Sequence, residues 1–297
     1  MDKALLEQFS KEISDKEVKD FYAEYALPII SDVLDEVSNK NELINPSTIK
    51  VFPIGDYTNG TAIDELGGEL EIVIACSNPQ LQISNTAYIK EYMKASSKEK
   101  TKINIKNTSE DIMKALYKAF ISQFSEKTTL IMYAQGIKIL CKEELGFNML
   151  IRFATFNEND DDMVLSFWNT IKKQTEPVSY FMYTDELEKK NKETKGNLYH
   201  LIRIFKSYRK TMLAKGWFSA NNITRYFIEA LAYNVPTRIL KDKDFEKAYA
   251  KSMIYLQNCP LTRFKSFDGK PINKCKLIKV SYNNLKTYLN GLIKLGA

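Results

Sequence analysis

One stretch, VFPIGDYTNGTAIDELGGELEIVIA, constrains the fold of this chain more than any other. It begins in a short apolar segment, passes through a glycine-led turn and a loop, and ends in a longer apolar segment. The run Ile72, Val73 and Ile74 is typical of a strand that is buried on both faces. Glu69 and Glu71 open this strand, and side chains two residues apart on a strand point to the same face. One divalent metal ion could bridge the two carboxylates, or they could be the solvated end of a strand beside a turn.

The rest of the chain divides into a mixed first part and a helical second part. Residues 1–39 repeat apolar side chains at three- and four-residue steps, which predicts a long N-terminal helix with a kink or restart at Pro28. NPQLQISNTAYIKEYMKASSKEKTK predicts a helix followed by a solvated basic loop, NTSEDIMKALYKAFISQFSEK predicts a further helix, and the apolar segments after it predict strands up to about residue 157. Strand signals then fade, and amphipathic segments predict helices. We therefore expect an α+β protein of two lobes, with a mixed sheet in residues 1–165 and helices in residues 166–297.

The composition excludes several classes of protein. The formal net charge of +6 is mild and dispersed, which argues against a large RNA substrate. The four cysteines form no C-x-x-C pair, and the single histidine is His200, so a structural zinc site is not expected. The N-terminal segment lacks the apolar core of a signal peptide, and no apolar run reaches membrane-spanning length. These features predict a cytoplasmic protein without membrane contact.

The order of the motifs resembles the DNA polymerase β-like nucleotidyltransferase superfamily. In that superfamily a strand leads into a Gly-Ser turn and a loop, two carboxylates stand on the next buried strand, and a third stands on a later strand. Gly55 and Asp56 occupy the turn here, Glu69 and Glu71 the paired carboxylates, and Asn148 the third position. NLYHLIRIFKSYRK and ITRYFIEALAYNVP are similar to the helical lobe of the cyclic GMP-AMP synthase/DncV-like nucleotidyltransferases (CD-NTases) of bacterial anti-phage signalling.

The resemblance implies a catalytic site in the first lobe. An active member would join nucleoside triphosphates into cyclic oligonucleotides and release pyrophosphate. Glu69 and Glu71 would hold Mg²⁺ or Mn²⁺, and Asn148 would stand at the third catalytic position. Gly55 and Asp56 would lie at the triphosphate, because a glycine turn lets backbone N–H groups close on phosphate.

The resemblance also implies nucleotide contacts in the second lobe. Lys206 matches a helix lysine that reaches the triphosphate, although most lysines on such a helix are surface charges. Arg225 matches a serine that touches phosphate, and Tyr226 matches an aromatic residue that stacks on a base. Both residues could instead lie at the edge of the core.

Four departures from the family pattern bear on activity. Asp56 places an anion where a hydroxyl binds phosphate, and Glu71 displaces its carboxylate by one methylene. Asn148 lacks the third negative charge, and Arg225 replaces a serine with a large cation. Asp56 could also be a simple turn residue, and Asn148 a buried amide. The leading hypothesis is a cyclic oligonucleotide synthase whose activity is weak or lost. The second is an inactive member that binds a nucleotide, a short oligonucleotide or a protein partner, and the third is a tRNA or antibiotic nucleotidyltransferase.

Two other features have ordinary interpretations. The acidic run at residues 157–163 lacks the glycine and the closing glutamate of an EF-hand, so it predicts a solvated loop. His200 lies among apolar residues and is expected to be structural.

Overall fold

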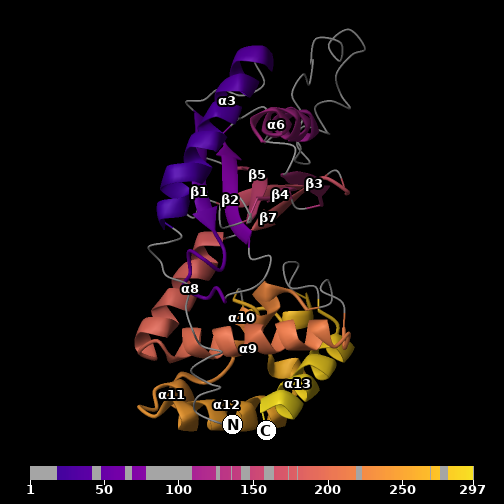
Figure 1. The fold of residues 1–297 in the computed structure, drawn as a ribbon. Coiled ribbons are helices and arrows are strands. Elements are labelled where there is room, and N and C mark those ends of the chain that lie inside the picture. Colours follow the sequence, from indigo (N-terminus) through magenta and orange to yellow (C-terminus); the bar gives the residue numbers. More distant parts are fainter. Residues whose placement is uncertain are drawn as a thin grey trace, which may run out of the picture. The chain divides into compact units, whose positions relative to one another are not determined.

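In the computed structural model of this protein, the chain forms two compact units. The structure describes residues 19–41, 48–63, 69–77, 109–124, 128–134, 136–141, 148–156, 164–172, 174–178, 180–218, 223–267, 269–274 and 280–296. The sheet unit comprises the described residues of 19–58 and 69–181, and the helical unit those of 59–63 and 182–296. The predicted α+β class is confirmed, because a mixed sheet and a group of helices occupy different parts of the chain (Figure 1). Residues 1–18, where the predicted N-terminal helix begins, and residues 78–102, where a helix and a basic loop are predicted, lie outside the described residues.

The sheet of the described chain has seven strands. They are β1 (Ile49–Ile54), β2 (Glu69–Cys76), β3 (Thr129–Tyr133), β4 (Gly136–Leu140), β5 (Asn148–Thr155), β6 (Leu165–Asn169) and β7 (Gln174–Val178). The main path runs β1-β2-β5-β4-β3, and β6 joins β5 and then β7. β2 and β5 are parallel and the other pairs are antiparallel, so the sheet is mixed.

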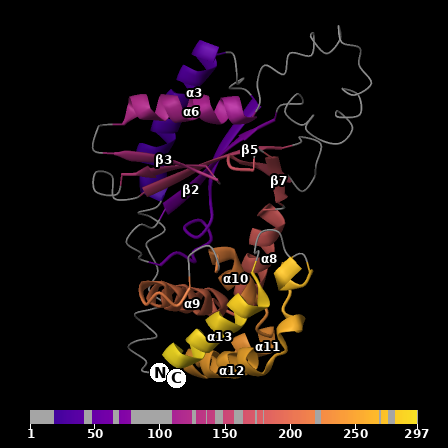
Figure 2. The ribbon, with the colours of Figure 1, turned by 90° about the vertical axis from the view of Figure 1, so that its right-hand side faces the viewer.

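The two faces of the sheet differ in chemistry. On one face, alternate residues of three strands are apolar and fully buried: Leu70, Ile72 and Ile74 of β2, Met149, Ile151 and Phe153 of β5, and Ile137 and Ile139 of β4. The helices α3 (Leu27–Asn41) and α6 (Ser109–Gln123) cover one side of the sheet (Figures 1 and 2). Most of their buried side chains are apolar, among them Ile30 and Val33 of α3 and Leu116 and Phe120 of α6. The opposite face of the same strands is mixed: it carries polar side chains near the starts of β2 and β5 and buried apolar ones, among them Val73, Ala75 and Ala154, further along.

The helix that begins the described chain changes its hydrogen bonding just before Pro28. Residues Tyr22–Ala26 form a π-helical turn, in which the N–H of Leu27 donates to the carbonyl of Tyr22. Pro28 has no N–H to offer, and such turns are a recognised cause of helix distortion. The irregularity that the sequence predicts at Pro28 is therefore present as a π turn.

The expectation that strands end near residue 157 was wrong. β6 and β7 extend the sheet, so the sheet unit reaches Phe181, beyond the boundary predicted after residue 165. β7 carries Pro177, which cannot donate to a strand partner, and it pairs only with β6 at the end of the described sheet. A short edge strand with a proline gives a weak strand signal, which explains why β7 was missed.

The helical unit is built around one long helix. Its elements are α8 (Tyr180–Glu193, which starts in the sheet unit), α9 (Asn197–Ala214), α10 (Arg225–Tyr233), α11 (Thr237–Leu240), α12 (Phe245–Asn258), α13 (Tyr282–Gly296) and two 3-10 turns (Leu261–Arg263 and Ile272–Lys274). α9 packs against α10, α12 and α13. The Tyr288 hydroxyl of α13 donates to the carbonyl of Phe205 in α9 at 2.6 Å, inside the core.

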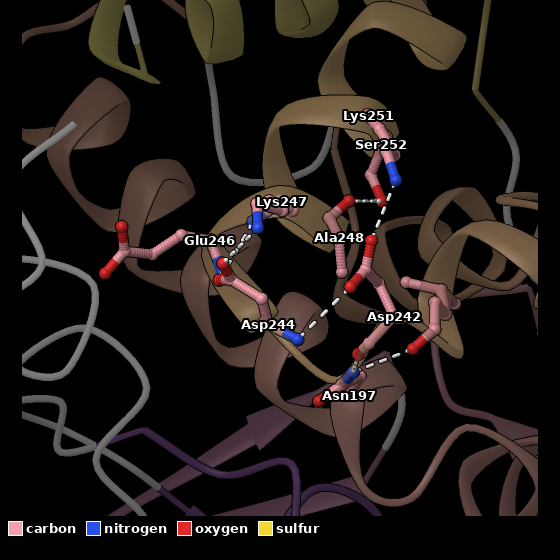
Figure 3. A network of polar contacts seen from close by, with 9 residues as sticks. Asn197, Asp242, Asp244, Glu246, Lys247, Ala248, Lys251 and Ser252 are labelled. Atoms are coloured by element: carbon pink, nitrogen blue, oxygen red, sulfur yellow. Dashed lines mark hydrogen bonds and ion pairs between the residues drawn. The ribbon is translucent and has the colours of Figure 1, made fainter.

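The start of α12 is fixed by two aspartates (Figure 3). Asp244 caps the helix by accepting the N–H of Lys247, and Asp242 accepts from the N–H of Asp244. Lys251 donates to Asp242 at 2.7 Å, and Asn197 at the start of α9 donates to the carbonyl of Asp242 at 3.0 Å. These acidic residues therefore satisfy backbone groups and have a structural role.

Candidate functional site

Three of the predicted site residues open two neighbouring strands. Glu69 and Glu71 lie at the start of β2, and Asn148 is the first residue of β5. The parallel register pairs Glu69 with Asn148 and Glu71 with Leu150. Paired residues share a face of the sheet, so both carboxylates and the amide lie on the face opposite the fully buried apolar residues. We call Glu69, Glu71, Asn148, Lys138 and Arg152 the polar face.

Two cations on neighbouring strands share this face with the carboxylates. Lys138 of β4 is aligned with Leu150, which puts its side chain on the same side of the sheet. Its ammonium group forms an ion pair with Oε1 of Glu69. Nη1 of Arg152, on β5, lies 3.5 Å from Oε2 of Glu71. The two glutamate side chains are only 16% and 15% exposed, so water screens these pairs weakly.

The glycine turn lies against one of the carboxylates. β1 ends at Ile54, which pairs with Glu71, and Gly55 follows with φ of +84°. A Cβ added at Gly55 would lie 3.4 Å from Cδ of Glu71, so the turn and the carboxylate are in close contact. The Thr58 hydroxyl closes the turn by donating to the carbonyl of Gly55 at 2.9 Å. Asp56, the next residue of the turn, is half-buried, and its role toward the triphosphate stays a prediction.

The residues of the polar face do not fit a two-metal site in this arrangement. Such a site needs carboxylates that are free to bind two divalent ions. Glu69 and Glu71 are each paired with a protein cation, and the third position carries the uncharged amide of Asn148. Among the residues that the structure describes, no three His, Cys, Asp or Glu side chains gather as metal ligands. The expected Mg²⁺ or Mn²⁺ would have to displace Lys138 and Arg152.

Lys206 is buried inside the helical unit. Its ammonium nitrogen lies 2.6 Å from Oε1 of Glu229 on α10, 2.8 Å from the Thr61 hydroxyl and 3.2 Å from the Thr61 carbonyl. The Thr61 hydroxyl in turn donates to Glu229 at 3.0 Å. An ammonium group has three hydrogens, and these three acceptors account for them. The structure thus places Lys206 in the core of the helical unit, and its role toward the triphosphate stays a prediction.

Two more cations of α9 bind backbone carbonyls. Arg203 donates to the carbonyl of Gly60 at 2.7 Å, and Arg209 donates to that of Ile223 at 2.7 Å. Arg203 and Lys206 thus attach residues 59–63, which follow the glycine turn in sequence, to α9, and Arg209 attaches the segment just before α10.

The other two predicted contacts lie at the start of α10. The helix begins at Arg225, and the residue that caps it is Thr224, whose hydroxyl accepts the N–H of Phe227 at 3.2 Å. The hydroxyl at this helix start therefore stands one residue before Arg225. Arg225 and Tyr226 are both half-buried, and the Tyr226 ring meets Tyr183 edge to face with centroids 5.5 Å apart. Their roles toward phosphate and base stay predictions.

Sequence reasoning missed Lys138, Arg152 and Glu229. Lys138 and Arg152 are single charges within the apolar strands GIKIL and NMLIRFAT, and that isolation was the signal that could have identified them. A charge in such a strand needs a partner, because burying an unpaired one is costly. Nothing in the local sequence links Glu229 to Lys206 or to Thr61.

The remaining candidates agree with their ordinary interpretations or lie outside the structure. His200 packs edge to face against Phe245, and burial together with the nearby charge of Arg203 lowers its pKa, which favours a neutral structural imidazole. The acidic run at 157–163 lies outside the described residues. Within the described residues, no helix has the length and apolar character needed to cross a bilayer.

Comparison with solved structures identifies the fold as that of the CD-NTases. Over 100% of this chain, the c-UMP-AMP synthase CdnE of Rhodothermus marinus aligns with a TM-score of 0.66 at 15% identity, covering 96% of that chain. The cyclic dinucleotide synthase CdnE of Elizabethkingia meningoseptica aligns over 100% of both chains with a TM-score of 0.71 at 12% identity. At these identities the likeness concerns the fold alone.

Sequence comparison agrees with this class. Residues 185–290 match the family model of the cGAS/DncV-like nucleotidyltransferase C-terminal helical domain. The cyclic dipyrimidine nucleotide synthase CdnE of Cecembia lonarensis is 36% identical over 70 residues, which are 23% of this chain and 24% of that synthase. The protein therefore resembles the cGAS/DncV-like nucleotidyltransferases in fold and in its helical part, as the motifs predicted.

Proposed function

We propose that this CD-NTase-like protein binds a nucleotide or a short oligonucleotide and does not perform metal-dependent nucleotidyl transfer. One observation carries the proposal: both carboxylates expected to hold metal are ion-paired with Lys138 and Arg152. The uncharged Asn148 beside Glu69 adds to it. The polar face thus carries two negative and two positive side chains.

Charge and hydration explain why a divalent ion is disfavoured there. Mg²⁺ gives up its bound water reluctantly, and it is usually held by one or two protein carboxylates together with substrate phosphates. To bind Glu69 and Glu71 it would have to break two weakly screened ion pairs and leave Lys138 and Arg152 without their partners. A charged group that loses its partner in a nearly buried position is costly. The carboxylates of the polar face are therefore expected to stay paired with Lys138 and Arg152 rather than to bind a divalent ion.

An active cyclic oligonucleotide synthase is the second candidate. It is favoured by the CD-NTase fold and by the juxtaposition of Glu69, Glu71 and Asn148 on one face beside the Gly55 turn. When bound, Mg²⁺ or Mn²⁺ would activate the attacking hydroxyl and neutralise the triphosphate. The relatives that align with this chain include synthases of cyclic nucleotides.

Calorimetry and a turnover assay on the full chain distinguish these candidates. Purified protein is titrated with ATP, GTP, CTP, UTP and short RNAs, once with EDTA and once with Mg²⁺. Pyrophosphate release is then measured with all NTPs and Mn²⁺. We expect binding that does not depend on metal, and no pyrophosphate.

Two results would contradict the proposal. Pyrophosphate release that Glu69→Gln abolishes would establish an active synthase. No binding of any nucleotide or RNA would leave a role in binding a protein partner.

A further inference from the structure

Both cations of the polar face come from strands that are otherwise apolar, and both are paired with carboxylates of β2. Lys138 and Arg152 project from the interiors of apolar strands, β4 and β5, whose side chains on the opposite face, such as Ile139 and Ile151, are buried hydrocarbons. Their ion pairs place Lys138 beside Glu69 and Arg152 beside Glu71, at the end of the sheet that carries the Gly55 turn. Both positive charges therefore lie where the fold presents its carboxylates.

We propose that Lys138 and Arg152 are built-in counter-cations that compensate Glu69 and Glu71 in place of divalent metal ions, and that these two side chains keep metal off the polar face. The idea rests on the proposed function and gives it a cause. On this inference, metal binding is prevented by Lys138 and Arg152 and not by the missing negative charge at Asn148.

The contacts of Arg152 support a role in charge compensation. Its guanidinium lies 3.9 Å from the centroid of the Phe167 ring, and within the described residues its Nε has no hydrogen-bond partner. Nη1 approaches Glu71 at 3.5 Å, which is longer than a bidentate arginine–carboxylate hydrogen bond. The attraction of the two charges and the ring, rather than a full set of hydrogen bonds, holds the side chain there. Arg152 therefore supplies Glu71 with a positive charge at the position where a metal ion would otherwise supply it.

The removal of both cations should create a metal site. Glu69, Glu71 and the amide oxygen of Asn148 would then remain on one face as oxygen ligands, and Mn²⁺ accepts carboxylate and amide oxygens. Two negative charges without compensation would attract a divalent ion strongly, because the positions are weakly screened. The change Asn148→Asp alone would not create such a site, since the cations would still be present.

The test is a Mn²⁺ titration of the purified full chain. Binding is monitored as the loss of the free Mn²⁺ signal in electron paramagnetic resonance. The variants are Lys138→Met/Arg152→Met, Asn148→Asp, and Lys138→Met/Arg152→Met with Glu69→Gln/Glu71→Gln. Lys114→Met is the matched control, because Lys114 pairs with Glu110 at 2.9 Å on the exposed surface of α6. Circular dichroism and thermal unfolding verify that each variant is folded.

We expect the double variant to bind one Mn²⁺ at least about tenfold more tightly than the wild type. The fourfold variant, Asn148→Asp and Lys114→Met should match the wild type. If the double variant does not fold, Arg152→Met alone is measured, and it should bind Mn²⁺ more tightly than the wild type.

Equal Mn²⁺ affinity in the wild type and the double variant, or in the wild type and Arg152→Met, would overturn the inference. So would an affinity gain that the glutamine substitutions do not remove. The readout is independent of turnover. Pyrophosphate release by the wild type would contradict the proposed function, whereas Mn²⁺ binding to Glu69 and Glu71 without turnover would contradict only this inference.

Discussion

The ammonium group of Lys206 lies 2.6 Å from the carboxylate of Glu229, and both side chains are 2% exposed. The hydroxyl of Thr61 bridges the two groups, so three side chains from distant parts of the sequence satisfy one another. This pair links α9, α10 and the segment after the glycine turn within the helical unit. Lys206, which the resemblance assigns to the triphosphate, lies in the core of the helical unit, and its role toward phosphate stays a prediction.

The Lys206–Glu229 pair predicts a specific stability pattern. Lys206→Met should lower the free energy of unfolding by about 3–5 kcal/mol, because it leaves Glu229 buried without its cation. Lys206→Met/Glu229→Met should recover most of this loss, since an apolar pair of similar volume needs no partner. Urea unfolding of both variants and of the wild type measures the difference.

Lys192→Met is the control for this experiment. Lys192 pairs with Glu188 on the exposed side of α8, so its loss should cost no more than about 1 kcal/mol. A stable Lys206→Met protein whose affinity for nucleoside triphosphates is lost would show instead that Lys206 is available to phosphate.

Gly136→Ala should disrupt the strand that carries Lys138. A Cβ at Gly136 would lie 2.1 Å from the carbonyl oxygen of Ile151, so β4 and β5 could not keep their spacing. We expect a loss of about 3 kcal/mol or more in the free energy of unfolding. Gly55→Ala has a positive φ but a nearest contact of 3.4 Å, so it should cost only about 1–2 kcal/mol. Equal losses in the two variants, compared by urea unfolding, would contradict this packing.

Lys190 predicts a dependence of stability on pH. It donates to the carbonyls of Tyr233 and Val235 at the end of α10, and burial lowers its pKa from 10.5 to about 8. At a pH between these two pKa values, the unfolded chain binds more protons than the folded chain. The contribution of Lys190 to stability therefore rises with pH. The urea midpoint of the wild type should therefore rise relative to that of Lys190→Met between pH 7.5 and 9.5, limits chosen around the cited pKa of about 8.

The other titrating groups are present in both the wild type and Lys190→Met, so their contributions to the pH dependence cancel in the comparison. Tyr233 has a pKa raised to about 12 by burial and by Glu186, so it stays protonated over this range. A constant difference between the two midpoints, or a difference that falls with pH, would contradict the prediction.

Restoring the family motif should not by itself restore turnover. One variant carries the four substitutions Asp56→Ser, Glu71→Asp, Asn148→Asp and Arg225→Ser, and a second adds Lys138→Met and Arg152→Met. We expect Mn²⁺-dependent pyrophosphate release only from the second, because the cations block metal in the first. Glu69→Gln in the second variant is the negative control. Turnover by the first variant would contradict the role given to Lys138 and Arg152.

The sequence predicted the parts of the fold that depend on local pattern. The apolar runs of β2 and β5 gave the central strands, and the motif order placed Glu69 and Asn148 together, as the register shows. β7 was missed because its proline and its short length weaken the pattern.

The contacts that define the site are non-local and could not be predicted in this way. Lys138 meets Glu69 only because β4 and β2 flank β5, an order that no local segment encodes. Thr61 and Lys206 are separated by 145 positions, and Lys206 and Glu229 by 23. Which charge neutralises which carboxylate is decided by the pairing of strands and helices.

A crystal structure of the wild-type protein with Mn²⁺ and a non-hydrolysable nucleoside triphosphate tests the central claim most directly. Anomalous scattering locates Mn²⁺ without ambiguity about its identity. We predict no anomalous peak on Glu69 or Glu71, with Lys138 and Arg152 still paired to them. A Mn²⁺ ion bridging the two carboxylates, with both cations displaced, would contradict the account.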